Sequence, residues 1–355
     1  MKFKLEDIVE VTMGQSPKSQ YYNTEGEGTP FLQGNRTFGF KRPTFDTYTT
    51  LVTKSAKAGD VIMSVRAPVG DLNITPVDMC LGRGVCSLRM KNGNQEFLYY
   101  MMKYYMPQLL NKESGTVFGS VNRNDINGLE VDIPEDVNKQ QRIARCLTMI
   151  DDQIELNTAI NNNLEQQAQA IYQDMFVTGA KPSWQIGHLS DLIDIKYGKD
   201  HKKLADGIYP VYGSGGIMHY VERPLYGKES VLIPRKGTLN NVIYVNQPFW
   251  SVDTMFYTEM KIPNIAKFIY HFVKSKDLAA MNAGSAVPSM TTAILNAMEL
   301  AIPSPDALSS FENSVAPMYA MIQENIFQSQ KLADLRDTLL PRLMSGELDV
   351  SDIDI

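Results

Sequence analysis

Two stretches of the chain repeat apolar residues with a strict seven-residue period. One begins after Pro134 and the other after Pro303, and in both the positions alternate in steps of four and three. This spacing is typical of a coiled-coil seam, whose residues face a partner helix. The first seam comprises Ile143, Leu147, Ile150, Ile154, Asn157, Asn161, Leu164, Ala168, Ile171 and Met175. The second, displaced by 168 residues throughout, comprises Phe311, Val315, Met318, Ile322, Asn325, Ser329, Leu332, Arg336, Leu339 and Leu343.

The polar seam residues lie near the middle of both predicted helices, each about 50 Å long. An antiparallel pair places Asn157 opposite Ser329 and Asn161 opposite Asn325. Such a buried polar layer fixes the register of the pair at some cost in stability. Arg336 would face an apolar residue, so it must reach solvent or bond elsewhere. The alternative is that each helix packs separately on its own domain.

Before each helix, short β-prone runs are separated by glycine and proline, as at 59–70, 230–238 and 241–253. Short helical stretches interrupt them at 96–110 and 266–275, and the tyrosines and methionines of the first are spaced as core residues. Each region is therefore predicted to be a mixed α/β domain with a bent sheet.

These two mixed regions also repeat each other. Residues 114–134 lie over 283–303 with six identities in 21 positions and no gap. Upstream the similarity is weaker and places Arg66 on Arg235. The identical pairs are Gly115 and Gly284, Ser120 and Ser289, Asn127 and Asn296, Glu130 and Glu299, Ile133 and Ile302, and Pro134 and Pro303.

The patterns together predict an α+β chain of two mixed α/β domains in a pseudo-twofold arrangement, joined by two long antiparallel coiled-coil helices. The expected boundaries are a first domain at 1–136, a central helix at 137–179, a second domain at 180–304, a C-terminal helix at 305–345 and an acidic tail at 346–355.

The net charge of −6 at first argues against binding to nucleic acid. However, residues 1–135 and 180–303 sum to +3, whereas the two linking segments carry −9. Charge therefore permits DNA binding by the two domains, although acidic residues that merely solvate the helices would give the same division. No apolar stretch is long enough to span a bilayer, and the three cysteines have no CxxC spacing. We expect a soluble cytoplasmic protein without a disulfide frame or a zinc site.

The sequence also resembles a known family. GDVIMSVRAPVGDLNI at 59–74, CLGRGVCSLRM at 80–90, SGTVFGSVNRNDINGLEVDIP at 114–134 and NKQQRIARCLTMIDDQI at 138–154 are similar to recurring segments of the specificity subunits of type I restriction-modification enzymes. The second copy is more diverged and lacks the paired glutamines Gln140 and Gln141. The resemblance covers essentially the whole chain.

The resemblance implies a non-catalytic protein with two target-recognition domains, each reading one half of a bipartite, asymmetric site in double-stranded DNA. Two modification subunits would bind along its helices, and restriction subunits would join through them. S-adenosylmethionine, ATP and magnesium would belong to those partners, and no cofactor or metal to this chain. The sequence has no GxxxxGK[ST] phosphate loop, no Asn-Pro-Pro-aromatic motif and no HExxH helix. Two alternatives are a coiled-coil adaptor without DNA readout and a self-contained restriction enzyme.

Candidate DNA contacts are long donors in loops, because arginine and lysine reach guanine edges and phosphates, and amides pair with adenine. In the first domain they are Gln15, Lys18, Asn35, Arg36, Arg66, Arg83, Asn122 and Arg123. In the second they are Lys199, His201, Lys202, His219, Arg235, Lys236 and Asn240. Arg66 and Arg235 rank highest because they occupy the same loop in both copies.

Overall fold

The computed structural model describes residues 1–110, 119–281 and 289–350. Gly115 and Gly284 of the repeat and the last five residues of the expected acidic tail lie outside these ranges. Among the described residues, no helix is long and apolar enough to cross a membrane.

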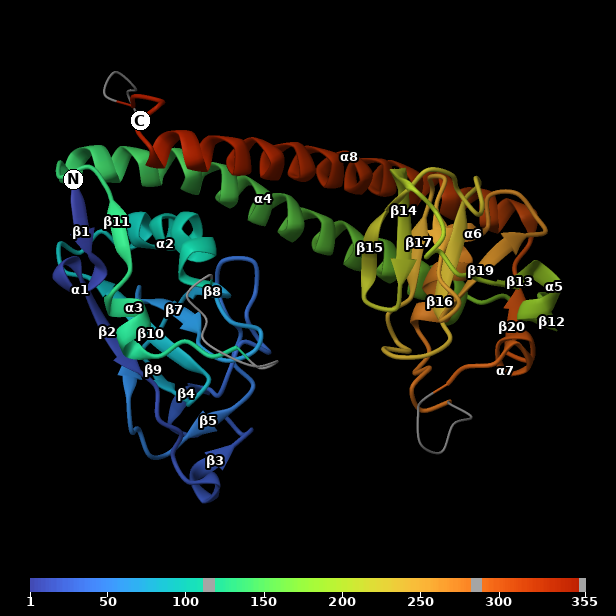
Figure 1. Cartoon of the computed structure of the whole chain (residues 1–355). Helices are drawn as coiled ribbons and strands as arrows, with labels where there is room; N and C mark the ends of the chain where they lie inside the picture. Colours follow the sequence, from blue (N-terminus) through green and yellow to red (C-terminus); the bar gives the residue numbers. More distant parts are fainter. Residues whose placement is uncertain (111–118, 282–288, 351–355) are drawn as a thin grey trace. The chain divides into compact units, whose positions relative to one another are not determined.

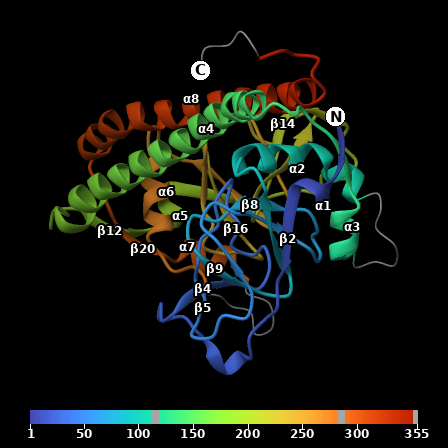
Figure 2. The same ribbon diagram turned by 90° about the vertical axis from the view of Figure 1, so that its left-hand side faces the viewer.

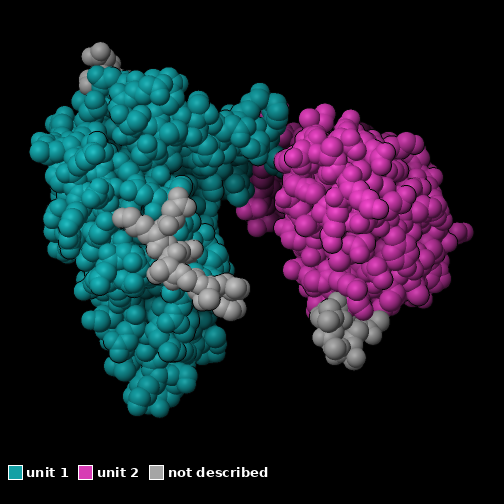
Figure 3. All heavy atoms as spheres, viewed as in Figure 1, with its two compact units in different colours: residues 1–159, 325–355 teal, residues 160–324 magenta. Residues whose placement is uncertain are grey.

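The chain forms two compact units (Figure 3). Unit 1 comprises Met1–Ala159 and Asn325–Ile355, and unit 2 comprises Ile160–Glu324. Both long helices contribute to both units, because α4 spans Val137–Tyr172 and α8 spans Pro305–Met344. They have 36 and 40 residues, and α4 continues directly into a π-helical turn at Gln173–Thr178.

Unit 1 contains three sheets (Figure 1). β2, β10, β7 and β8 form an antiparallel sheet, β1 pairs with β11, and the remaining strands form a sheet in the order β3-β5-β4-β9-β6, within which β4 and β9 are parallel. The strands are β1 Lys2–Lys4, β2 Val9–Met13, β3 Tyr22–Asn23, β4 Thr29–Leu32, β5 Tyr48–Thr49, β6 Ser55–Ala56, β7 Val61–Ser64, β8 Leu72–Ile74, β9 Met79–Leu81, β10 Val85–Met90 and β11 Glu130–Asp132. The helices besides α4 and α8 are α1 Leu5–Ile8, a 3-10 turn at Ser19–Tyr21, α2 Gln95–Leu110 and α3 Arg123–Asn127.

The core of unit 1 lies around α2, which Figure 2 shows between the sheet and the long helices. Tyr99 and Tyr100 are buried there, as their spacing predicts. Ile143 and Leu147 of α4 and Leu343 of α8 belong to the same apolar cluster. The C-terminal part of α8 therefore packs on unit 1 and not on the domain that precedes it in the sequence, which argues against two separately packed helices.

Unit 2 repeats this order of elements. β13, β19, β16 and β17 form the four-stranded sheet, β12 pairs with β20, and β14 lies between antiparallel β15 and parallel β18. The strands are β12 Gln185–His188, β13 Ile193–Tyr197, β14 Asp206–Gly213, β15 Gly216–Val221, β16 Ser230–Pro234, β17 Ile243–Val245, β18 Trp250–Ser251, β19 Met255–Met260 and β20 Glu299–Ile302. The helical elements are a π-helical turn at Gln173–Thr178, α5 Leu189–Leu192, α6 Ala266–Lys274 and α7 Thr292–Asn296.

The core of unit 2 is rich in aromatic rings. Phe268 of α6 and Phe256 of β19 are buried with Tyr172 near the end of α4 and with Phe311 and Val315 of α8. Side chains of this size each contribute about 1.5–3 kcal/mol when fully buried. Both units are thus mixed α/β domains, as the sequence predicts, and segments of the two long helices complete each of them.

Candidate nucleic-acid interface

Loops from distant parts of unit 1 meet at one end of its sheets, joined by backbone hydrogen bonds. The amide of Gln15 donates to the carbonyl of Leu81 over 2.9 Å, and the amide of Val65 donates to Gly84 over 2.9 Å. The amide of Val121 donates in turn to Val65 over 3.1 Å. These bonds tie together three segments that carry predicted DNA contacts and the residues just before α3. The segments and the backbone bonds between them form the backbone frame of unit 1.

Unit 2 forms the same set of bonds. The amide of Lys199 donates to Ser251 over 2.8 Å, and that of Arg235 donates to Thr254 over 2.8 Å. The amide of Met290 donates to the carbonyl of Arg235 over 2.9 Å. The frame that holds the loops together is therefore repeated bond for bond, although few of its side chains are identical.

The bonds correct the expected match between Arg66 and Arg235. Arg66 forms an isolated bridge with Ser120, and Lys236 forms the same bridge with Ser289. Arg66 therefore corresponds to Lys236, while Arg235 occupies the preceding position, which is a buried valine in unit 1. The sequence match failed because it applied to the upstream strands the shift that relates residues 114–134 to the second copy. In the structure, the upstream strands of the two units are related by a shift that differs by one residue.

Some predicted contacts have bonds that serve the fold. Asn122 caps α3 by accepting from the amide of Asn124 over 2.8 Å. Arg123 donates to the carbonyl of Val11 over 2.7 Å, and Asn240 donates to Asp277 over 3.1 Å. A contact with DNA by these three side chains would compete with those bonds.

Two further candidates in unit 1 bond to carboxylates. Arg36 forms an exposed ion pair with Asp46 at 2.7 Å, and this bond lowers the pKa of Asp46. The amide of Asn35 donates to Asp71 over 2.5 Å. Exposed pairs of this kind contribute at most about 1 kcal/mol, so either donor can exchange its partner for another anion.

The remaining candidates differ in exposure. His201 and His219 are half-buried and lie 2.9 Å apart, Nδ1 to Nε2, while Arg235 is also half-buried. The other seven of these remaining candidates are exposed, namely Gln15, Lys18, Arg66, Arg83, Lys199, Lys202 and Lys236. Contact with DNA by any of these residues remains a prediction.

One pair of equivalent positions shows how the frames differ chemically. Strand pairing aligns Cys86 with Phe256, so Arg83 of unit 1 corresponds to Asp253 of unit 2. Both residues are exposed. An arginine and an aspartate on the same backbone frame present opposite charges, so the two surfaces favour different partners.

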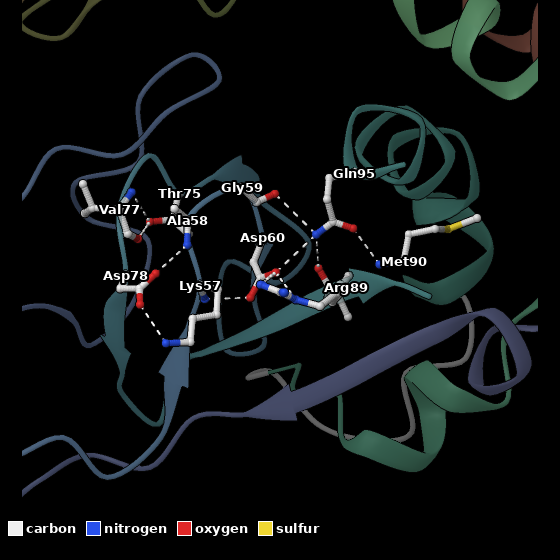
Figure 4. Close-up of polar contacts among 11 residues, drawn as sticks. Lys57, Ala58, Gly59, Asp60, Thr75, Val77, Asp78, Arg89, Met90 and Gln95 are labelled. Atoms are coloured by element: carbon white, nitrogen blue, oxygen red, sulfur yellow. Dashed lines mark hydrogen bonds and ion pairs between the residues drawn. The ribbon is translucent and has the colours of Figure 1, made fainter. Parts of the chain in front are cut away.

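A buried carboxylate, missed in the sequence, holds β7 in place just before the Arg66 loop (Figure 4). Asp60 accepts from Arg89 Nε over 2.7 Å, from the backbone amide of Lys57 over 2.8 Å and from Gln95 over 3.2 Å. Burial raises the pKa of Asp60, while the bonds to Lys57 and Arg89 oppose that shift. The turn before β7, the strand β10 and the start of α2 are thereby joined.

The helix seam is paired as predicted within unit 1. The amide nitrogen of Asn157 lies 3.1 Å from Ser329 Oγ and 2.9 Å from Gln328 Oε1. All twenty seam residues are buried or half-buried. Asn161 and Asn325 belong to different units, so their pairing stays a prediction.

Arg336, the exception in the seam, bonds to a residue that the heptad pattern does not identify. Its NH1 lies 2.8 Å from Oδ1 of Asp151, which is fully buried beside the seam. Tyr100 of α2 donates to the other oxygen of Asp151 over 2.6 Å. This triad joins α2, α4 and α8 in unit 1.

Unit 2 joins its own short helix, α6, to α4 and α8 through different chemistry. His271 of α6 lies 2.7 Å from Gln169 of α4 and 2.9 Å from the hydroxyl of Tyr319 of α8. Burial lowers the pKa of His271 to about 4, so the ring is neutral at pH 7. Lys267 bonds to Glu312 of α8 over 2.7 Å.

The sequence matches the family described as the type I restriction modification DNA specificity domain over residues 1–166 and 182–327. The two matched segments cover most of the chain and fall on the two repeats. The chain therefore belongs to this family of DNA-specificity proteins.

Known relatives agree with this assignment. The MjaX specificity subunit of Methanocaldococcus jannaschii is 35% identical over 49% of this chain and 41% of that protein. The MjaIX specificity subunit of the same organism is 22% identical over 99% of this chain and 94% of that protein. The solved type I S subunit from M. genitalium shares the fold, with a TM-score of 0.61, 19% identity and coverage of 97% and 95%. The chain is a type I restriction-modification specificity subunit with two target-recognition domains.

Proposed function

We propose that this subunit selects a bipartite DNA site and reads one half with each unit. The observation that carries the proposal is the repeated backbone frame with unlike side chains, such as Arg83 in unit 1 against Asp253 in unit 2. A common frame fixes where the loops meet the duplex, and different side chains then select different bases. The predicted target is therefore split and asymmetric.

We further propose that two modification subunits bind along the long helices. In unit 1 these helices leave large apolar side chains about half exposed, although the seam itself is covered. A group of large, exposed apolar side chains on the same pair of helices favours contact with a protein partner. They are Met149, Leu156, Ile326, Phe327 and Leu335, with exposed fractions of 47–57%.

In this proposal the chain performs no reaction of its own. S-adenosylmethionine would bind to the modification subunits, and ATP and magnesium to the restriction subunits that join through them. The chain would determine which DNA site is bound and would hold the partner subunits together.

A methylation experiment tests the proposal directly. The gene is deleted in its host, and long-read sequencing that detects methylated bases is compared between the two strains. We expect a split motif, methylated on both strands, that disappears with the gene and returns on complementation. Unchanged methylation would contradict the proposed function.

The two alternatives predict different results with purified protein. The assembled complex is titrated with duplex DNA at several salt concentrations. A DNA reader loses affinity steeply as salt rises, because phosphate contacts release counterions. A protein adaptor would bind the modification subunit but show no such DNA binding, and a self-contained nuclease would cleave DNA with metal alone.

A further inference from the structure

Arg235 lies at the end of β16 on an aromatic stack that begins in the core of unit 2. Its guanidinium carbon is 5.4 Å from the ring centroid of Tyr197. The Tyr197 ring packs edge-on at 5.1 Å against Phe256, which is fully buried. Arg235 NH1 also donates to the carbonyl of Asp253 over 3.3 Å. The stack and this bond restrict the side chain before any ligand arrives.

The backbone of Arg235 is fixed as well. Its amide and its carbonyl both take part in the frame, with Thr254 and Met290 as partners. Because backbone and side chain are already ordered, binding through Arg235 loses little conformational entropy. The guanidinium has five N–H donors and is half-exposed, so donors remain for a ligand.

The surroundings of Arg235 suit an anionic duplex. Lys236 follows it directly and is exposed. Lys199 is exposed on the neighbouring loop, whose backbone is held by bonds to Ser251 and from the Trp250 ring nitrogen over 2.9 Å. Flexible lysines suit phosphates, whereas a planar, oriented arginine suits the paired O6 and N7 acceptors of guanine.

We propose that Arg235 reads a guanine in the half-site recognised by unit 2 and that Tyr197 is its positioning residue. This inference rests on the proposed function. Unit 1 has Val65 at the corresponding position, and Val65 is buried. A contact made from this position is therefore confined to the half-site of unit 2, which makes Arg235 a source of the asymmetry between the two halves.

The first test compares methylated motifs in cells that produce variants of the whole subunit with its partners. In Arg235→Gln and Arg235→Lys, one guanine position in one half-site should become degenerate, while the spacer and the other half stay unchanged. Arg235→Lys is decisive because it keeps the charge but loses the planar fork. Tyr197→Phe should preserve the motif, and Tyr197→Ala should relax the same position as Arg235→Gln.

The second test measures binding of the assembled complex to duplexes in which one guanine is replaced by 7-deazaguanine, which lacks the N7 acceptor. Replacement at the position read by Arg235 should weaken binding of the wild-type complex by roughly 5- to 150-fold. The same replacement should have no effect on the Arg235→Gln complex. Lys236→Gln is the matched control, and it should weaken binding to all duplexes equally.

Several results would overturn the inference. One is an unchanged motif in Arg235→Lys, which would assign Arg235 to a phosphate. Another is loss of all methylation together with a lower unfolding temperature of the variant, which would assign Arg235 to the fold. If the half-site altered by Arg235→Gln contains no guanine, the inference that Arg235 reads a guanine is refuted. The proposed function would stand in that case. Absence of any split motif would overturn the proposed function, and this inference with it.

Discussion

The buried triad of unit 1 leads to a quantitative prediction about stability. Arg336 and Asp151 form an ion pair at 2.8 Å, in which the aspartate side chain is 0% exposed and the arginine side chain 11%. Tyr100 donates to the same carboxylate over 2.6 Å. Replacing Arg336 by methionine keeps most of the side-chain volume but leaves the carboxylate without its cation.

The expected cost follows from that burial. Removing one partner of a buried ion pair costs about 3–5 kcal/mol, because a charge stays buried and uncompensated. Tyr100 still donates to Asp151, so we place the loss near the lower end, at about 3 kcal/mol. Domains are stable by only about 5–15 kcal/mol, so unit 1 of Arg336→Met should unfold at clearly lower urea concentration.

The double variant Arg336→Met with Asp151→Leu separates the effect of an uncompensated buried charge from the effect of lost packing. It buries no uncompensated charge, and the Tyr100 hydroxyl alone loses a partner, which costs about 1–3 kcal/mol. We therefore expect the double variant to be no less stable than Arg336→Met. Asp337→Asn is the matched control: Asp337 also bonds to Arg336, but it is 65% exposed, so its loss should change stability by less than about 1 kcal/mol.

The two units can be followed separately in urea. The only two tryptophans, Trp184 and Trp250, belong to unit 2, so tryptophan fluorescence reports on that unit. Far-ultraviolet circular dichroism reports on both units. The dichroism transition should shift in Arg336→Met more than the fluorescence transition. A loss below about 1 kcal/mol, or strict additivity of the two substitutions, would refute the reasoning.

Three further predictions concern other sites. Burial lowers the pKa of His271 from 6.5 to about 4, so the unfolded chain takes up a proton at higher pH than the folded chain does. The free energy of unfolding of unit 2, followed by fluorescence, should therefore fall by about 2 kcal/mol between pH 7 and pH 5. This loss should be absent in His271→Gln. Asn157→Leu should raise stability but relax helix register, giving mixed species in analytical ultracentrifugation; a single species would contradict this. Arg66→Gln should weaken DNA binding of the assembled complex by about 1–3 kcal/mol if Arg66 reads a base, and unchanged affinity would exclude it.

Much of the architecture is predictable because its periodicity is local. The heptad spacing identifies both long helices and the partner of Asn157, because in an antiparallel pair the register follows from where the polar residues lie. The short helix at 96–110 and the burial of its tyrosines follow from helical spacing in the same way. These patterns need no knowledge of distant contacts.

The parts that could not be predicted depend on contacts between distant segments. Asp151 lies beside the seam, and only the folded chain brings it to Arg336 and Tyr100. The correspondence of Arg66 with Lys236 follows from strand register, which a match between two arginines cannot reveal. The stacking of Arg235 on an aromatic ring likewise joins the ends of two strands that are not adjacent in the sequence.

The path of α8 has a consequence for how the chain is made. Leu343, Met344 and Val350 complete the apolar core around α2, although α2 is synthesised more than two hundred residues earlier. Unit 2 is formed by the continuous segment Ile160–Glu324, which includes the N-terminal half of α8, whereas unit 1 also needs the C-terminal half of α8. Of the two units, unit 1 therefore begins earlier in the chain and is completed later. A premature stop within the C-terminal half of α8 would leave unit 2 with its own residues and would damage unit 1, whose other residues all precede unit 2 in the chain.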